Sequence, residues 1–165
     1  MTHRMEVALE LPVNPNDQVL VLDTDLLFQG DPFEVFNESN FDFFYTSRSF
    51  KSNFKVNAGV WGFVNNQRSR KLLRFLIEQA NHPSWKPYLE FRREKDWWSN
   101  QDLLCVIAEH NPPIEVKLHD AGEKYNCCPR SVEGISLSKE SINEFFGKIG
   151  NNYYKIIHYK ELEKQ

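Results

Sequence analysis

The sequence is poor in cysteine and in long apolar runs, and each shortage excludes a class of protein. Its 165 residues include three cysteines, Cys105, Cys127 and Cys128, an odd number without CxxC spacing, so neither a disulfide scaffold nor a zinc site is indicated. No apolar run approaches the roughly 20 residues of a membrane helix, and residues 1–15 lack the apolar stretch of a secretion signal. We therefore expect a cytoplasmic protein without a membrane span.

Net charge is also small. Lys and Arg total 20 and Asp and Glu total 23, a formal charge of −3, which argues against a nucleic-acid-binding protein. Aromatic residues are abundant, with 13 Phe, 6 Tyr and 4 Trp, and their burial can offset the entropy cost of ordering a chain. No repeat or linker divides the sequence. We therefore expect residues 1–165 to form one folded domain.

Strand and helix patterns alternate along the chain. Short apolar runs predict strands at 18–22, 41–46, 56–64, 114–118 and 154–159. Helical spacing predicts helices at 5–11, 66–81, 99–108 and 138–146, with a short helix or turn after Asp31-Pro32. Inside the third strand, Gly59 and Gly62 indicate a bend or a close backbone approach. The alternation predicts an α/β fold built on a layered sheet.

Two aspartates follow the first apolar strand, in the stretch VLVLDTDLLF. Asp23 and Asp25 project to the same side, because side-chain direction repeats every two residues in extended chain. Two carboxylates on one side need a cation, a proton or water between them, and Mg²⁺-like ions bind in this way beside substrate phosphates. The alternative is structural: Asp25 caps the following turn, and Asp23 is the hydrated end of the strand.

Five blocks occur in a set order along residues 19–160: VLVLDTDLLFQGDPFEVF, VNAGVWGF, SNQDLL, KYNCC and KIIHYK. In their joint order and spacing they resemble nucleotide-sugar glycosyltransferases of the GT-A fold, closest to family 8, the glycogenin and galactosyltransferase group. The resemblance implies a mixed sheet flanked by helices. It also implies metal-dependent transfer of a sugar from a nucleotide-sugar donor to a hydroxyl of a sugar or protein acceptor. Because 22 residues precede Asp23, it covers the part of the fold from the DxD motif onward, without most of the amino-terminal nucleotide-binding half.

The resemblance implies a metal site. Asp23 and Asp25 form the DxD motif, with Asp25 as the direct ligand and Asp23 also able to reach the donor ribose, and His158 completes the metal shell. A mixed oxygen and nitrogen ligand set favours Mn²⁺ over Mg²⁺. The alternative for His158 is a hydrogen-bonded residue at a strand end. Lys160 stands nearest to the family's diphosphate-binding lysine, although the family's Gly and Lys-Pro-Trp are missing here.

Three further blocks match family positions near the sugar or the acceptor: Asn57-Ala58-Gly59, Gln101-Asp102 and Tyr125-Asn126. The resemblance implies that the first contacts sugar hydroxyls and admits the donor. It gives Asp102 and Gln101 a place beside the reacting sugar, and places the last block on the acceptor side. Structural alternatives remain open, namely a bulged strand at 57–59 and a capping box of Ser99 with Asp102 at the start of a helix.

Two other functions remain open. The first is a phosphatase of the haloacid dehalogenase type, which also carries D-x-D after an apolar strand, with the first Asp as nucleophile. In this sequence, however, Leu26 and Leu27 stand where such phosphatases have Gly-Thr or a similar pair of small residues, and no GDxxxD motif follows. The second is a non-catalytic remnant or binding module of the glycosyltransferase fold. With so short an amino-terminal region, we expect poor activity from the chain alone. Without the preceding strands, the VLVL strand at 19–22 or its neighbour would be an apolar edge of the sheet, and such edges are normally covered or paired. We therefore also expect a homo-oligomer, or a partner chain that supplies the nucleotide-binding half.

Overall fold

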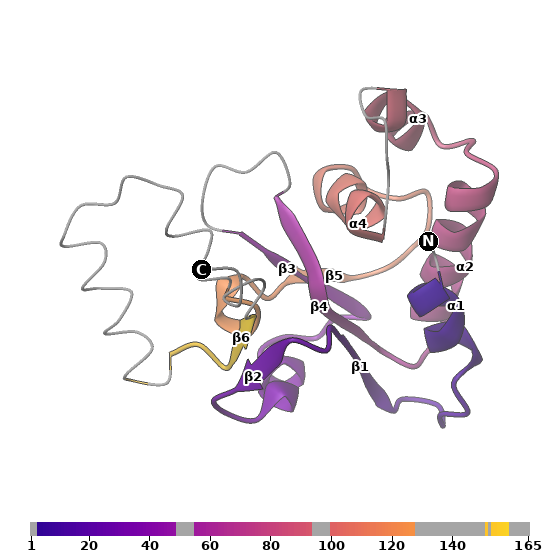
Figure 1. Ribbon diagram of the computed structural model, residues 1–165. Helices are drawn as coiled ribbons and strands as arrows, with labels where there is room; N and C mark the ends of the chain where they lie inside the picture. The colour runs from indigo at the N-terminus through magenta and orange to yellow at the C-terminus, as the bar shows by residue number, and fades with distance from the viewer. Residues whose placement is uncertain (1–2, 49–54, 94–99, 128–150, 152, 159–165) are drawn as a thin grey trace, which may run out of the picture.

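Helices and strands alternate along the computed structural model, which describes residues 3–48, 55–93, 100–127, 151 and 153–158 (Figure 1). The first half contains α1 (His3–Glu10), β1 (Gln18–Leu22), β2 (Leu26–Phe28), the 3₁₀ helix η1 (Pro32–Asn37), β3 (Phe43–Ser47) and β4 (Val56–Val64). The second half contains α2 (Gln67–Asn81), α3 (Lys86–Arg93), α4 (Asn100–Glu109), β5 (Leu118–Asp120), the 3₁₀ helix η2 (Glu123–Tyr125) and β6 (Ile156–His158). The expected α/β class is confirmed.

The main sheet is mixed. Its strand order is β1-β4-β3-β5, with β4 antiparallel to both neighbours and β5 parallel to β3. The strands β2 and β6 form a separate antiparallel ribbon. Within the described residues β1 is therefore an edge strand of the main sheet, as the sequence led us to expect. No helix in the described part of the chain is long and apolar enough to cross a membrane.

Each face of the main sheet carries its own apolar cluster. Helices α1, α2 and α4 cover one face, with α3 packed on α4, and Phe43, Trp61 and Phe63 are buried there with the apolar stripe of α2 (Figure 1). The segments η1, η2 and β6 cover the opposite face, where Phe44 and Val60 are buried. Because neighbouring strand residues point to opposite faces, consecutive apolar residues such as Phe43 and Phe44 serve two cores. Burial on both faces explains the long apolar run of β4.

Gly62 marks a close approach of the backbone, as expected. A Cβ at this position would lie 2.4 Å from the carbonyl oxygen of Val19 and 2.6 Å from a ring carbon of Phe44. The first of these atoms belongs to the backbone of β1 and cannot move aside cheaply. Glycine at position 62 therefore allows β1 and β4 to pair while Phe44 packs beneath them.

Helix α2 begins where its pattern predicted. The side chain of Asn66 accepts the N–H groups of Arg68 at 2.9 Å and Ser69 at 3.0 Å, and the Ser69 hydroxyl lies 3.2 Å from the Asn66 nitrogen. These contacts form a capping box. The expected helix at 138–146 lies outside the described residues.

The strand expected at 114–118 is wrong in position, because β5 covers residues 118–120. The N–H of Lys117 donates to the Asp42 carboxylate at 2.9 Å, and so does not enter a strand ladder. Pro112 and Pro113 have no N–H to contribute. Pairing with β3 therefore begins only at Leu118, which lies opposite Phe43.

Candidate functional site

The carboxyl end of β1 lies against the first half of β4. Leu22 is paired with Val60, and the N–H of Asp23 donates to the carbonyl oxygen of Gly59 at 2.8 Å. The DxD block and the block at 57–59 are therefore neighbours in space. Ligand crevices of open α/β sheets form at such strand ends.

Residues 57–60 of β4 form a bulge. Tyr45 is paired with Trp61 and Ser47 with Val56, so four residues of β4 lie opposite the single residue Thr46 of β3. The bulged strand, which was the structural alternative considered for residues 57–59, is therefore present. A bulge re-aims the residues that it contains, and bulges are common beside active sites. Here the bulge lies on the side of β4 that faces β3, while the ladder with β1 continues regularly to the bond between Asp23 and Gly59.

Buried polar side chains hold the bulge in place. The Thr46 hydroxyl lies 2.9 Å from the carbonyl oxygens of Asn57 and Val60, and donates its single proton to one of them at a time. The side-chain amide of Asn126 donates to this hydroxyl at 2.9 Å and to the Asn57 carbonyl at 3.1 Å. Asn126 thus has a structural contact in the site, and its predicted contact with an acceptor stays a prediction.

Asn57 carries an unused donor. Its Oδ1 accepts the N–H of Gly59 at 3.2 Å, while its Nδ2 is buried and has no hydrogen-bond partner in the part of the chain that the structure describes. A buried amide hydrogen without a partner is costly, so a ligand oxygen or a water at this point would be favoured. This agrees with the prediction that the Asn57 amide contacts sugar hydroxyls, without testing it.

Arg4 is a residue of the site that sequence analysis missed. Its Nη1 pairs with Oδ1 of Asp23, and the two side chains are 37% and 20% exposed. Helix α1 therefore brings a guanidinium group to the DxD motif. A signal was present in the sequence, since Arg4 is the single Lys or Arg among residues 1–47, a segment rich in acids.

The ribbon of β2 and β6 joins the DxD motif to the end of the described chain. Residue 158 is paired with Leu26, which directly follows Asp25. The backbone at 158 is thus next to the motif, although the His158 side chain lies outside what the structure describes. The described side chains include no group of three metal-binding residues. Asp23 and Asp25 with an imidazole from position 158 would be a donor set suited to Mn²⁺.

The predicted pair on α4 lies on the helix-covered side of the sheet. Asp102 is fully buried in the first turn of the helix and Gln101 is half-buried. Burial raises the pKa of Tyr88 to about 12, and the nearby charge of Asp102 adds to this rise. The role of Gln101 and Asp102 beside a sugar stays a prediction. Ser99, its predicted capping partner, and Lys160 lie outside the described residues.

Tyr125 anchors η2 rather than facing solvent. Its ring is fully buried, and its hydroxyl donates a hydrogen bond to Oε1 of Glu38 at 2.9 Å. The same oxygen accepts a hydrogen bond from Nζ of Lys124 at 2.6 Å. Burial and the bond to Glu38 raise the pKa of Tyr125 to about 12. The Tyr125 hydroxyl is therefore a donor at neutral pH, and its bond fixes η2 so that Asn126 reaches the bulge.

No protein-family model and no curated protein matches the sequence. Solved structures do match. The glycosyltransferase GlyE of Streptococcus pneumoniae TIGR4 is 18% identical with a TM-score of 0.57, over 98% of this chain and 37% of that protein. The galactosyltransferase LgtC, in complex with donor and acceptor sugar analogues, is 12% identical with a TM-score of 0.55, over 98% and 58%. Mouse xyloside xylosyltransferase 1 in its apo form is 15% identical with a TM-score of 0.57, over 97% and 61%.

The chain therefore has the fold of part of these glycosyltransferases, and it spans less than two thirds of the length of each. The expected partial glycosyltransferase fold is therefore confirmed as a fold. At these identities the similarity concerns the fold, and the activity depends on the residues of the site.

Proposed function

We propose that this chain carries the metal- and sugar-binding part of a family 8-type glycosyltransferase, which transfers a sugar from a nucleotide-sugar donor to an acceptor hydroxyl. The observation that carries the proposal is the pairing of β2 with β6. It brings position 158 next to Leu26, and so to the DxD motif, from the far end of the sequence. The bulge of β4, bonded to Asp23, adds the third block of the same site.

Each residue at the motif has a distinct part in this proposal. Arg4 already neutralises Asp23, so we assign the direct metal bond to Asp25, with His158 as the second protein ligand. Asp23 is left to orient Arg4 and to reach the donor ribose. A bound Mn²⁺ or Mg²⁺ would supply Lewis acidity for the departing nucleoside diphosphate. Lys160 would add positive charge beside that phosphate, and the Arg4 guanidinium, already paired with Asp23, would donate hydrogen bonds to it.

The bulge supplies the sugar contacts. The buried Nδ2 of Asn57 is the donor aimed at a sugar hydroxyl, and the backbone at Ala58 and Gly59 lets the donor approach closely. Asn126 positions this segment through Thr46 and the Asn57 carbonyl. The acceptor would approach from η2. Gln101, half-buried in the first turn of α4, would contact the transferred sugar, and Asp102, fully buried there, would position this turn.

The decisive experiment measures Mn²⁺ affinity by calorimetry with ADP, GDP or UDP present, on the wild type and on Asp25→Asn and His158→Gln. Outer contacts of metal sites are worth about 10- to 100-fold in affinity, so loss of the direct ligand Asp25 should cost at least about tenfold. Glu115→Gln is the matched control, because the Glu115 side chain is 88% exposed and its ion pair is with Arg68, outside the candidate site. Equal Mn²⁺ affinity of wild type and Asp25→Asn would contradict the proposal.

A binding module without catalysis is the second candidate, and one contact favours it. The guanidinium of Arg4 balances the charge of Asp23 without any metal. Hydrolysis of a panel of nucleotide sugars separates the two candidates, since a transferase, even one that turns over slowly as the chain alone, releases nucleoside diphosphate above background in a Mn²⁺-dependent way that Asp25→Asn abolishes. Mn²⁺-dependent binding of the nucleotide without release would favour the module.

A further inference from the structure

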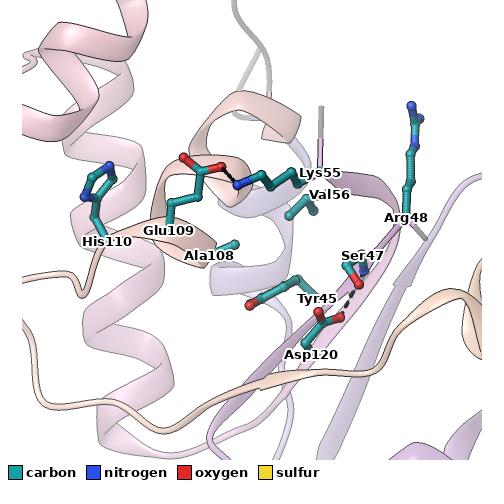
Figure 2. A pocket seen from close by; sticks show the side chains of 9 residues that line it. All are labelled: Tyr45, Ser47, Arg48, Lys55, Val56, Ala108, Glu109, His110 and Asp120. Carbon is teal, nitrogen blue, oxygen red and sulfur yellow. Dashed lines mark hydrogen bonds and ion pairs between the residues drawn. The ribbon is translucent and has the colours of Figure 1, made fainter. Parts of the chain in front are cut away.

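A pocket of about 500 Å³ lies on the helix-covered side of the sheet, where β3 and β5 end and β4 begins (Figure 2). Residues of β3 and β4 form one wall, and the last residues of α4 form the other. None of the residues assigned to the candidate donor site lines this pocket. It is therefore a separate hollow of the described structure.

The pocket and the candidate donor site lie back to back on the same strands. Tyr45 and Ser47 line the pocket, whereas Thr46 between them faces the bulge network. In the same way Val56 lines the pocket and the next residue, Asn57, belongs to the donor site. Because side chains alternate between the faces of a strand, a ligand in the pocket would be separated from the donor site by one sheet thickness.

The pocket combines an apolar floor with fixed carboxylates. Ala108 and the ring of Tyr45 supply the apolar surface, and the fully buried Val56 completes the lining (Figure 2). Oδ1 of Asp120 accepts the N–H groups of Ser47 at 3.1 Å and Gly122 at 2.9 Å. Both bonds hold the same oxygen, so the carboxylate is fixed in place while Oδ2 remains able to accept a hydrogen bond from a ligand.

On the opposite wall, Glu109 is held by Lys55, with Oε1 and Nζ 2.8 Å apart. The lining thus contains two basic side chains, Lys55 and Arg48, and two acidic ones, Glu109 and Asp120, whose charges cancel. His110 also lines the pocket. A strongly anionic or cationic ligand gains little from such a balance. A neutral ligand with many hydroxyl groups can use both the carboxylates as acceptors and the ammonium group as a donor.

Tyr45 adds a further donor and a flat surface. Burial raises the pKa of Tyr45 to about 12, and the charge of Asp120 contributes to the rise, so its hydroxyl keeps its proton at neutral pH. Sugars present an apolar ring face surrounded by hydroxyl groups. Binding sites for small ligands commonly combine an apolar lining with a few placed polar groups, as this pocket does.

We propose that this pocket is a second carbohydrate site, which binds a neutral saccharide independently of the metal and the nucleotide-sugar donor. The apolar face of a sugar ring lies on Tyr45 and Ala108, and its hydroxyl groups donate to Asp120 and Glu109. The site goes beyond the proposed transfer reaction, because it needs no residue of the DxD motif.

The test is a titration followed by amide NMR on the full chain. The probes are the methyl glycosides of glucose, galactose, xylose and N-acetylglucosamine, then lactose and maltose, each raised to high millimolar concentration. At least one should shift the amide signals of Ser47, Val56 and Ala108. Tyr45→Phe and Glu109→Gln should each weaken that binding several-fold, whereas Tyr153→Phe, at an exposed tyrosine away from the pocket, should leave it unchanged.

Two controls separate this site from the donor site. Asp25→Asn should bind the saccharide like the wild type. This holds whether the substitution abolishes Mn²⁺ binding or the wild type itself binds no Mn²⁺. The proposal is overturned if no sugar of the panel shifts the three amides, or if the shifts occur only around Asp23 and Asn57. It is also overturned if inorganic phosphate shifts the three amides more strongly than any neutral sugar, since the pocket would then be an anion site.

Discussion

The two faces of the main sheet are covered by different kinds of structure. On one face the long helix α2 and the helix α4 pack over Trp61 and Phe63. On the other, three-residue strands and short 3₁₀ helices cover Phe44 and Val60. A helix satisfies its own backbone hydrogen bonds, whereas short irregular segments need side chains to do so. The β2–β6 ribbon, η2 and the hydrogen bonds of Thr46 and Asn126 in the candidate donor site belong to the second face.

On the second face, polar side chains therefore supply the hydrogen bonds that hold the irregular segments in place. Thr46 and Asn126 bond the carbonyl groups of the bulge, and Glu38 holds η2 through Tyr125. None of these contacts adds apolar burial. We therefore expect the helix-covered face to determine the stability of the fold and the opposite face to determine the geometry of the site.

The largest expected effect is that of Leu76→Ala, which opens a cavity under α2. Leu76 is fully buried, and such truncations cost about 2–5 kcal/mol of unfolding free energy. Urea denaturation should show this loss with an unchanged slope. The folded variant should still bind Mn²⁺ and nucleoside diphosphate like the wild type. A folded Leu76→Ala protein with weakened binding would show that the two faces are not separable.

A smaller loss of stability with a larger effect on binding is expected for Thr46→Val. The substitution keeps the shape of the side chain but removes the hydroxyl that bonds the bulge. An unsatisfied buried polar group costs about 1–3 kcal/mol, and the released bulge should lower nucleotide-sugar affinity as well. Thr46→Ser retains the hydroxyl and is the matched control. If Thr46→Val loses stability but keeps full affinity, the bulge does not shape the site.

Most elements of the helix-covered face were predictable because they are long and periodic, although α3 (Lys86–Arg93) was not predicted. The strand at 56–64 and the helix beginning after Asn66 were predicted with the bounds that the structure has, or within one residue of them. The close approach at Gly62 was predicted as well. In each case a repeated apolar pattern and a local signal, a cap or a glycine, pointed to the same element.

The irregular face was predicted less well, for a physical reason. β2 and β6 are three residues long, and β2 exists because it pairs with a segment from the far end of the chain. Similarly, the bulge is stabilised by Asn126, and Asp23 is paired with Arg4. Contacts between residues so distant in sequence leave no periodic pattern. The motif at Asp23 and Asp25 could be recognised, but what surrounds it could not be derived from spacing.

The smallest expected effect is a change in pH dependence on replacing Glu38 by Gln. Partial burial alone would raise the pKa of Glu38, but hydrogen bonds from Lys124 and Tyr125, the charge of Lys124 and a weaker contact with His119 together hold it below its ordinary value of 4.5. A carboxyl whose pKa is lowered by folding stabilises the fold above its unfolded-state pKa. That stabilisation is lost as the pH falls through the folded-state pKa.

Glu38→Gln should therefore cost about 1 kcal/mol at neutral pH, the usual worth of a hydrogen bond to a partly exposed group. The difference from the wild type should be constant above about pH 5 and shrink below pH 4.5, as wild-type Glu38 takes up its proton. Urea denaturation of both proteins between pH 3 and pH 7 measures this directly. Because Glu38 acts on the bulge through Tyr125 and Asn126, nucleotide-sugar affinity should fall in parallel at neutral pH. A difference that grows toward low pH would mean that Glu38 is not held as a carboxylate by Lys124 and Tyr125.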